Sequence, residues 1–387
     1  MQPFTNSKLP ESFLEEVAAS GLEALPELLS VLLNTAMRAE RERYLGVGPY
    51  ERSTERRSQA NGFKPKTLQT RLGPLSLEIP QTRDSGFYPE ALEKGQRSER
   101  ALKLTLAEMY VQGVSTRKVE AILRELTGGE VSSTQVSRAM AELDPLLQTW
   151  RQRPLGECPY LILDARYEKV RLAGGVQEAA VLVAIGIRAD GHRSVLGVSV
   201  AVSEHEVHWR SFLQSLVARG LGGVKLIVSD AHAGLKAARQ AVLGGVPWQR
   251  CQFHLQQNAQ AFITKTELKA PVAADIRAIF QAPDLTHAQE LLRKTVQKYS
   301  KSQPKLAAWM EENLQEGFAV FAFPTAHQRL LRTSNLLERV NRELKRRSRV
   351  VGIFPNPDSC LRLLSANLME LSEQWESGKI YLSFDSD

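Results

Sequence analysis

Hydrophobic and polar positions repeat with two different periods along this chain. Apolar residues at helical spacing between positions 28 and 36 predict a helix that ends near Glu40. Residues 75–79 instead alternate between apolar and polar side chains, which predicts a half-buried strand after a hairpin turn around Gly73. The N-terminal region is therefore expected to combine a helix with a small hairpin.

Three further helices are predicted between residues 101 and 143, separated by glycines. The third opens at Ser132 with the Ser-x-x-Gln form of a capping box. Its outward-facing residues are Ser133, Thr134, Gln135, Ser137 and Arg138. Small polar and basic residues at the start of a helix suit a helix-turn-helix that enters the major groove of DNA. An ordinary three-helix packing unit produces the same pattern, so both interpretations stay open.

Beyond Pro145 and Pro154 the pattern changes to strands. Strands are predicted at residues 160–164, 169–172, 179–187, 193–202, 224–229 and 247–253. Helices are predicted at residues 205–218 and 231–243 and in a helix-rich stretch from about 256 to 315. Antiparallel strands followed by strands that alternate with helices indicate the α/β class, with a mixed sheet flanked by helices.

The charge of the chain points to a polyanionic partner. Its 387 residues include 50 Lys and Arg against 43 Asp and Glu, a net charge of +7, so nucleic acid is the first expectation. One basic cluster, between residues 38 and 71, includes Lys64 and Lys66. A second, between residues 329 and 349, includes Arg342, Lys345, Arg346 and Arg347. Such clusters bind phosphates without reading bases, although each alone could equally be a solvated surface.

Three acidic residues stand where metal-dependent chemistry would need them. Asp164 and Asp230 close apolar runs, and Glu338 lies in a predicted helix with Asn341 beside it at the edge of the apolar stripe. Two aspartates on adjacent strands and a glutamate on a covering helix can hold two divalent cations for in-line phosphoryl transfer.

Each acidic residue also has a simpler explanation. Asp230 could be an ordinary helix cap, and Glu338 could form a surface ion pair with Arg342. Asp164 is harder to explain in this way, because the apolar-polar alternation continues after it. Its carboxylate should therefore project from within a hairpin, where a half-buried charge needs a partner such as a metal.

The cysteines predict a reducing compartment. Only three occur and they are widely spaced, so a disulfide framework is not expected. Neither a signal peptide nor a membrane-spanning stretch is recognisable, which favours a cytoplasmic protein without a membrane partner. Cys251 and His254 have the spacing of half a zinc site, but no second pair follows. A packing or active-site support role is favoured for them.

Four blocks, at residues 164–171, 229–235, 251–254 and 333–341, resemble the signature blocks of the Mutator-type family of bacterial insertion-sequence transposases in both order and spacing. The likeness continues through residues 346–355 and, upstream, through residues 61–66 and 113–117. It covers nearly the whole chain, and several blocks in one order are far more specific than a single motif. The three acidic residues, Asp164, Asp230 and Glu338, are all present in their blocks.

The resemblance implies a ribonuclease H-like catalytic domain in which Asp164, Asp230 and Glu338 bind Mg²⁺, with Mn²⁺ as a possible substitute. Cys251 and His254 would be the Cys-x-x-His element of the family, and they and Asn341 would support the acidic site. The implied division of the chain is 1–97 (helical and basic, with the hairpin), 98–150 (helix-turn-helix), 157–255 (first catalytic part), 256–325 (α-helical insertion) and 326–387 (final catalytic part).

The implied activity is cleavage and strand transfer of DNA at the ends of an insertion sequence. The partners would be double-stranded DNA, as terminal inverted repeats and as target, and a second copy of the chain, because two ends must be joined in one complex. Two alternatives stay open. One is a ribonuclease H-like nuclease or resolvase that cuts without joining, and the other is a DNA-binding repressor that no longer catalyses.

Overall fold

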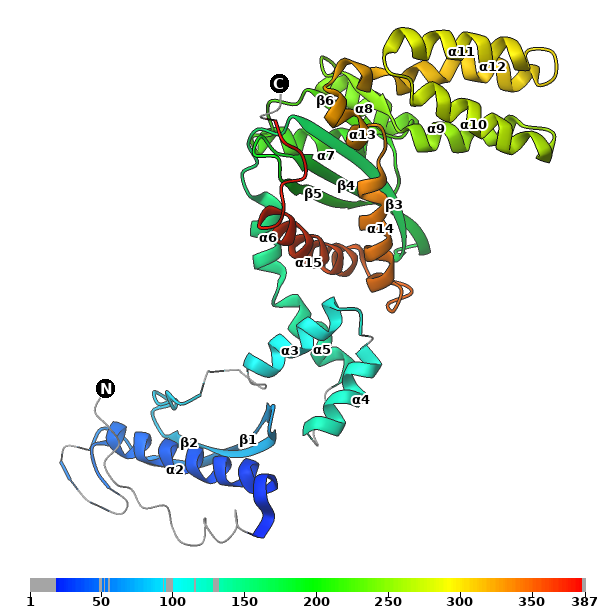
Figure 1. The fold of residues 1–387 in the computed structure, drawn as a ribbon. Coiled ribbons are helices and arrows are strands. Elements are labelled where there is room, and N and C mark those ends of the chain that lie inside the picture. The colour runs from blue at the N-terminus through cyan, green and yellow to red at the C-terminus, as the bar shows by residue number, and fades with distance from the viewer. Residues whose placement is uncertain are drawn as a thin grey trace. The chain divides into compact units, whose positions relative to one another are not determined.

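The computed structural model describes residues 19–48, 51, 53–54, 56–92, 94, 100–114, 116–127 and 132–384 (Figure 1). The chain divides into two compact units, Met1–Glu142 and Leu143–Asp387. No helix in the described part of the chain is long and apolar enough to cross a membrane.

The first unit begins with a helix packed on a hairpin. After the short helix η1 (Gly21–Ala24), α2 (Leu25–Leu45) covers the antiparallel strands β1 (Ala60–Thr70) and β2 (Gly73–Thr82). The alternating residues of β2 predicted to be half-buried turn inward and pack with Met37 of α2. The predicted hairpin is confirmed, while α2 extends beyond the predicted end and stops where Gly46 adopts a left-handed conformation (φ 74°).

Three helices with a shared apolar core complete the first unit. They are α3 (Arg100–Val111), α4 (Thr116–Thr127) and α5 (Ser133–Ala141). The predicted capping box is confirmed: the Ser132 hydroxyl accepts the Gln135 amide at 3.3 Å, and Gln135 Oε1 accepts the Ser132 amide at 2.7 Å. The cap therefore defines where α5 begins.

The second unit is built on a five-stranded mixed sheet of order β5-β4-β3-β6-β7. Its strands are β3 (Tyr160–Leu172), β4 (Gly175–Ile187), β5 (Arg193–Ala201), β6 (Leu226–Ser229) and β7 (Trp248–Arg250). The first three are antiparallel neighbours, and β6 and β7 run parallel to β3. The predicted mixed α/β architecture is confirmed.

Two strand predictions were wrong in detail. The strands predicted at 160–164 and 169–172 are one strand, because every residue of β3 pairs with β4 and no turn interrupts the ladder. The strand predicted at 247–253 is limited to β7, since a helix already begins at Gln252. Asp164 therefore lies within a strand, and Cys251 lies where β7 gives way to helix.

Helices flank both faces of this sheet (Figure 1). Their bounds are α6 (Asp144–Gln152), α7 (Glu206–Ala218), α8 (Ala233–Leu243), α14 (Asn335–Ser348) and α15 (Pro357–Glu376). Leu161 and Leu163 of β3 share a core with α7 and α8 on one face. Residues at the intervening positions point to the other face, where α14 and α15 contact β3.

A helical segment with an apolar core of its own lies between β7 and α14. It comprises α9 (Gln252–Ala259), η2 (Gln260–Phe262), η3 (Thr266–Leu268), α10 (Lys269–Phe280), α11 (Leu285–Tyr299), α12 (Pro304–Asn313), η4 (Leu314–Gly317), η5 (Ala319–Ala322) and α13 (Thr325–Leu331). The predicted helix-rich stretch is confirmed. This segment has a separate core, and after it the chain returns to the sheet with α14 (Figure 1).

Candidate active site

Asp164 and Asp230 are brought together by the parallel pairing of β3 and β6. Ile162 pairs with Val228, so the same register continued for two residues sets Asp230 beside Asp164. Residues paired across parallel strands project to the same face of a sheet. Asp230 comes directly after the last residue of β6, whereas Asp164 lies inside the longer β3. The Asp164 side chain therefore lies on the face that α14 covers, and Asp230 is near enough to influence its pKa.

The surroundings of Asp164 disfavour its charged form. Burial, followed by the neighbouring Asp230 carboxylate, raises the pKa of Asp164 to about 7, and Glu204 adds to this rise. His254 and the Ala165 amide, which donates to Asp164 Oδ1 at 3.0 Å, work in the opposite direction. A cation bound beside this carboxyl group would favour its charged form, so metal binding would release the proton.

Helix α14 approaches this pair through Asn341. The Asn341 side-chain amide donates to Asp164 Oδ2 at 2.9 Å. Glu338 lies almost one turn earlier on the same helix, half-buried, and its Oε1 is buried without a hydrogen-bond partner. Residues three apart share one face of a helix, so Glu338 lies on the same face of α14 as Asn341, the residue that contacts Asp164.

The three carboxylates suit a divalent cation in their chemistry, since Mg²⁺ prefers oxygen ligands. A cation would give the unpartnered Glu338 Oε1 a partner, and it would stabilise the charged form of Asp164, whose pKa is raised by burial and by the Asp230 carboxylate. Across the described residues, no three His, Cys, Asp or Glu side chains lie close enough together to hold a metal ion. The carboxylates of Asp164, Asp230 and Glu338 would therefore have to move closer together to bind the same ion.

Cys251 and His254 support the site from the end of β7. Cys251 raises the pKa of His254 to about 9 against the opposing effect of burial, and Asp164 and Asp230 contribute to the rise. The imidazole is therefore charged at neutral pH and offsets the carboxylates. Burial opposes a thiolate at Cys251, but His254 lowers the pKa of this thiol below its usual value.

Cys251 also anchors the beginning of α14. Its buried Sγ accepts hydrogen bonds from the backbone and the hydroxyl of Ser334, both at 3.3 Å. Ser334 is the N-cap of α14, and its carbonyl accepts the Glu338 amide at 3.1 Å. The Cys-x-x-His element thus connects the sheet to the glutamate-bearing helix through hydrogen bonds.

We expect Cys251→Ala to destabilise the protein by about 1–3 kcal/mol more than Cys360→Ala does. Both thiols are fully buried, but only the first substitution leaves the buried donors of Ser334 without an acceptor. Urea unfolding of the two variants measures the difference. Equal losses would show that the bonds to Ser334 contribute nothing beyond the packing of a thiol.

Two networks at the site, one of them buried, went unnoticed in the sequence. In the first, Arg166 donates to the Asn341 carbonyl at 3.1 Å and pairs with Glu168, which also accepts the Ser348 hydroxyl at 2.8 Å. It holds β3 against α14. The alternation of β3 places Arg166 and Glu168 on the same face as Asp164, which was the only available signal.

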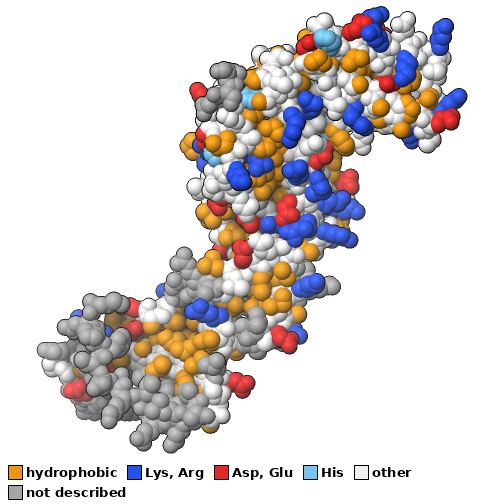
Figure 2. Space-filling model, in the orientation of Figure 1, with side chains coloured by type: hydrophobic (Ala, Val, Ile, Leu, Met, Phe, Trp, Pro, Cys, Tyr) orange, Lys and Arg blue, Asp and Glu red, His pale blue; other side chains and the backbone are white. Residues whose placement is uncertain are grey.

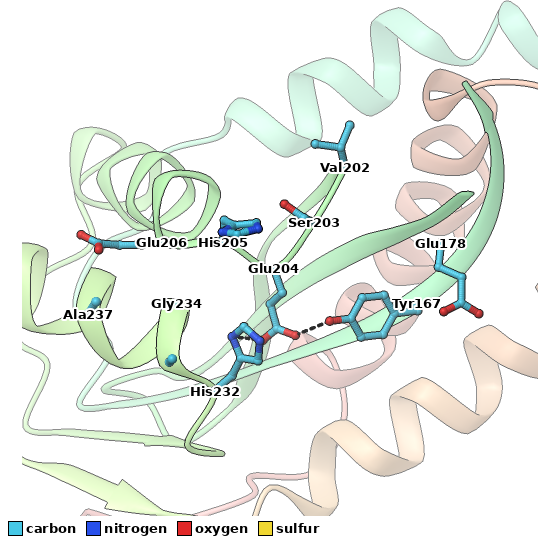
Figure 3. Close-up of a pocket in the computed structure, with 11 residues that line it drawn as sticks. Tyr167, Glu178, Val202, Ser203, Glu204, His205, Glu206, His232, Gly234 and Ala237 are labelled. Atoms are coloured by element: carbon cyan, nitrogen blue, oxygen red, sulfur yellow. Dashed lines mark hydrogen bonds and ion pairs between the residues drawn. The ribbon is translucent and has the colours of Figure 1, made fainter. Parts of the chain in front are cut away.

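The second network surrounds Glu204, in the loop between β5 and α7. Its carboxylate contacts Tyr167 and His232, and these side chains line a cavity of about 760 Å³ (Figure 3). Glu204 has no distinguishing spacing in the sequence, since it is a lone acidic residue in the short loop 202–205 and belongs to none of the motifs.

The basic residues after Glu338 fall into two groups. Arg342, Lys345 and Arg346 are exposed, Arg346 while donating to Glu343, and Figure 2 shows a band of Lys and Arg side chains over α14. Arg347 is only 11% exposed and donates to Glu343, Asn367 and Glu370. Its guanidinium holds α14 against α15, so its surroundings do not support the phosphate contact predicted for it.

The DNA contacts predicted in the first unit also differ in exposure. Lys64, Thr134 and Arg138 are exposed, and Lys66 is half-buried with its ammonium group 3.1 Å from the Tyr88 hydroxyl. Lys64, Lys66 and Gln135 line one pocket of about 680 Å³. Part of the Gln135 side chain is used in the cap of α5. The side chain of Ser133 lies outside the described residues.

Comparison with known proteins gives a consistent result. A family model described as "Transposase, Mutator family" matches residues 6–378. The transposase for insertion sequence element IS406 of Burkholderia multivorans is 59% identical over 368 residues, covering 95% of each chain. That for ISRM5 of Rhizobium meliloti is 41% identical and covers 98% of this chain and 96% of its own. That for IS256 in transposon Tn4001 of Staphylococcus aureus is 38% identical, with coverage of 92% and 93%.

Among solved structures, a chain of the simian T-cell lymphotropic virus intasome in complex with PP2A regulatory subunit B56 gamma matches at 12% identity. The match covers 53% of this chain and 64% of that chain, with a TM-score of 0.19. Similarity this low carries no argument about the fold.

Proposed function

The chain belongs to the Mutator family of transposases, and from this premise we propose that it binds the terminal inverted repeats of an insertion sequence and cleaves and joins DNA with a metal-dependent Asp164–Asp230–Glu338 site. The observation that carries the proposal is the parallel pairing of β3 and β6, which brings Asp230 near Asp164, together with the hydrogen bond from Asn341 of α14 to Asp164. These contacts support a site to which three segments far apart in the chain would contribute.

We propose a ribonuclease H-like fold for the catalytic part. Its support is the strand order β5-β4-β3-β6-β7, with three antiparallel strands followed by two parallel ones. Asp164 lies on the central strand and Asp230 directly after the parallel neighbour of that strand. The helical segment before α14 corresponds in position to the insertion implied by the family resemblance.

In this mechanism the protein residues position charge at the reacting phosphate. Asp164, Asp230 and Glu338 would hold Mg²⁺, for which Mn²⁺ is expected to substitute. When bound, the metal activates water or a 3′-hydroxyl and stabilises the leaving oxygen during in-line displacement. Asn341 fixes one oxygen of Asp164, and His254 offsets negative charge beside the two aspartates. Joining two element ends further requires a dimer or larger assembly on DNA.

The decisive experiment supplies Mg²⁺ and a pre-cut element end and looks for products joined to a target duplex. Joined products support the proposal. Hydrolysis without joining would favour a nuclease or resolvase built on the same site. A protein that binds the inverted repeats but performs neither reaction would instead be a repressor.

We further propose that the basic residues of both units bind DNA. Lys64, Lys66, Thr134 and Arg138 would hold the inverted repeats, together with Ser133 and Gln135, as the family resemblance implies. Arg342, Lys345 and Arg346 would contact phosphates beside the reaction centre. The exposure of Lys64, Thr134, Arg138 and the α14 residues supports this assignment.

Replacing both Arg342 and Lys345 by Ala is expected to reduce the slope of log Kd against log salt concentration by about 2, because each lost phosphate contact removes about 0.9. Arg347→Ala is the matched control on the same helix. It should leave the slope unchanged and lower the stability, since Arg347 is already paired with carboxylates. Fluorescence anisotropy across a salt series measures the slopes. If only Arg347→Ala changed the slope, Arg347 would contact phosphate, and Arg342 and Lys345 would not.

A further inference from the structure

Glu204 is a nearly buried carboxylate that has no place in the metal trio. Its side chain is 9% exposed and meets three neighbours. The Tyr167 hydroxyl donates to Oε2 at 2.8 Å, the Trp209 indole donates to Oε1 at 3.2 Å, and His232 Nδ1 lies 3.4 Å from Oε1. Figure 3 shows Glu204 between His232 and Tyr167, with contacts to both. Two hydrogen bonds at this burial hold the Glu204 side chain in one position, and the His232 ring lies close beside it without a hydrogen bond from Nδ1.

Two of these neighbours belong to the segments that carry the aspartates. Tyr167 lies on β3, three residues after Asp164. His232 lies two residues after Asp230, and its backbone amide donates to Asp230 Oδ1 at 3.2 Å. Because odd separations along a strand point to opposite faces, Glu204 reaches β3 from the face opposite to α14. Glu204 therefore connects the segments of Asp164 and Asp230.

Backbone packing reinforces the same connection. A Cβ atom on Gly234, in the first turn of α8, would lie 2.4 Å from the Glu204 carbonyl oxygen and 2.9 Å from the Glu206 nitrogen. Only glycine allows the two backbones to approach this closely. The segment that follows Asp230 is thus pressed against the loop that carries Glu204.

Asp230 needs such support because the sheet does not hold it. The pairing of β6 with β3 ends at Val228, and its pairing with β7 ends at Ser229. Asp230 lies just beyond both ladders, so the turn that follows determines where its carboxylate points. In that turn, His232 contacts Asp230 through its backbone and Glu204 through its side chain.

We propose that Glu204 is a positioning residue that holds the Asp230–His232 turn against β3 and keeps Asp230 beside Asp164. The proposal rests on the proposed function, because it assigns Glu204 to the support of that metal site. Outer residues that orient metal ligands typically affect metal affinity or activity by about 10–100-fold when they are replaced.

The test compares Glu204→Gln with Glu206→Gln. In Glu204→Gln, an NH2 donor replaces one of the two oxygens that accept from Tyr167 and Trp209, and the charge beside His232 is lost. Glu206, by contrast, pairs with Arg210 on the surface of α7. We expect the half-saturating Mg²⁺ concentration for strand transfer to rise about tenfold in Glu204→Gln, with the maximal rate within about threefold of wild type. Glu206→Gln should match wild type in both. A lower maximal rate at an unchanged Mg²⁺ requirement would overturn the positioning role.

A second measurement needs neither metal nor DNA. In hydrogen–deuterium exchange, the amides of residues 230–234 should exchange about tenfold faster in Glu204→Gln and at the wild-type rate in Glu206→Gln. Tyr167→Phe keeps the carboxylate and removes one hydrogen bond, so it should give about a threefold effect in both measurements even where Glu204→Gln fails to fold. Exchange at the wild-type rate in both Glu204→Gln and Tyr167→Phe overturns the inference. A wild-type protein that joins no DNA overturns the proposed function and leaves the exchange result to decide on Glu204.

Discussion

Glu338→Gln is expected to lower strand transfer at least about 1000-fold, while binding to the inverted repeats stays within about threefold of wild type. A metal-assisted transition state gains several kcal/mol from the bound ion, and each 1.4 kcal/mol is a factor of ten in rate. The amide keeps the shape of the side chain and removes the charge of Oε1, the buried oxygen without a partner. Joined products from a pre-cut end measure the rate, and gel shifts measure binding.

Glu343→Gln is the matched control for this prediction. Glu343 lies on the same helix, and hydrogen bonds from Arg346, followed by those from Arg347, lower its pKa to about 2 against the effect of burial. Its loss should affect the stability of α14 and leave the rate of joining within a few fold. If the two variants lost activity equally, Glu338 would have no special part in the reaction.

Without metal, the protein is expected to lose about 1–3 kcal/mol of stability as the pH rises from about 4 to about 7. The pKa of Asp164 is about 7 in the folded protein against 3.8 ordinarily, so the folded form keeps a proton that the unfolded chain has released. This contribution to stability is complete below about pH 3.8 and is lost as the pH rises through about 7. The full difference in pKa sets a limit of about 4 kcal/mol. Thermal unfolding in EDTA across this pH range measures the loss.

Mg²⁺ should restore the stability at pH 7.5, because an ion that binds only the folded form stabilises it. Asp164→Asn should be more stable than wild type at that pH in EDTA and should not respond to Mg²⁺. Asp284→Asn is the control, since the His287 backbone amide lowers the pKa of this exposed helix cap, so no gain is expected. An EDTA melting temperature that stays constant between pH 4 and 7.5 would contradict the high pKa of Asp164.

Much of the fold was predictable because it depends on local patterns. The capping box at Ser132, the hairpin around Gly73 and the alternation in residues 75–79 are encoded by neighbouring residues, and all three are present. The continuity of β3 was missed, because its polar middle, Arg166 to Glu168, resembles a turn when it is read without its partner strand. Pairing with β4 on one side and the packing of α14 against one face make that segment a strand.

The residues of the candidate site were likewise predictable from the sequence only in part. Asp164, Asp230 and Glu338 were identified from apolar runs and from blocks shared with a family, both of which are properties of the sequence. The contact between Asn341 and Asp164, the role of Arg347 in packing, and the contacts of Glu204 with Tyr167 and His232 join residues that are far apart in the chain. No spacing in the sequence could have indicated them.

The sequence by itself thus determined which residue types can carry the chemistry, the order of most helices and strands, and the charge that attracts a polyanion. These properties depend on single side chains and on periods of two or 3.6 residues. Only the tertiary structure decided which carboxylates share a face, which arginines are already paired and which loop supports Asp230. Burial and long-range register set those outcomes, because the same side chain has a different pKa, partner and accessibility in each environment.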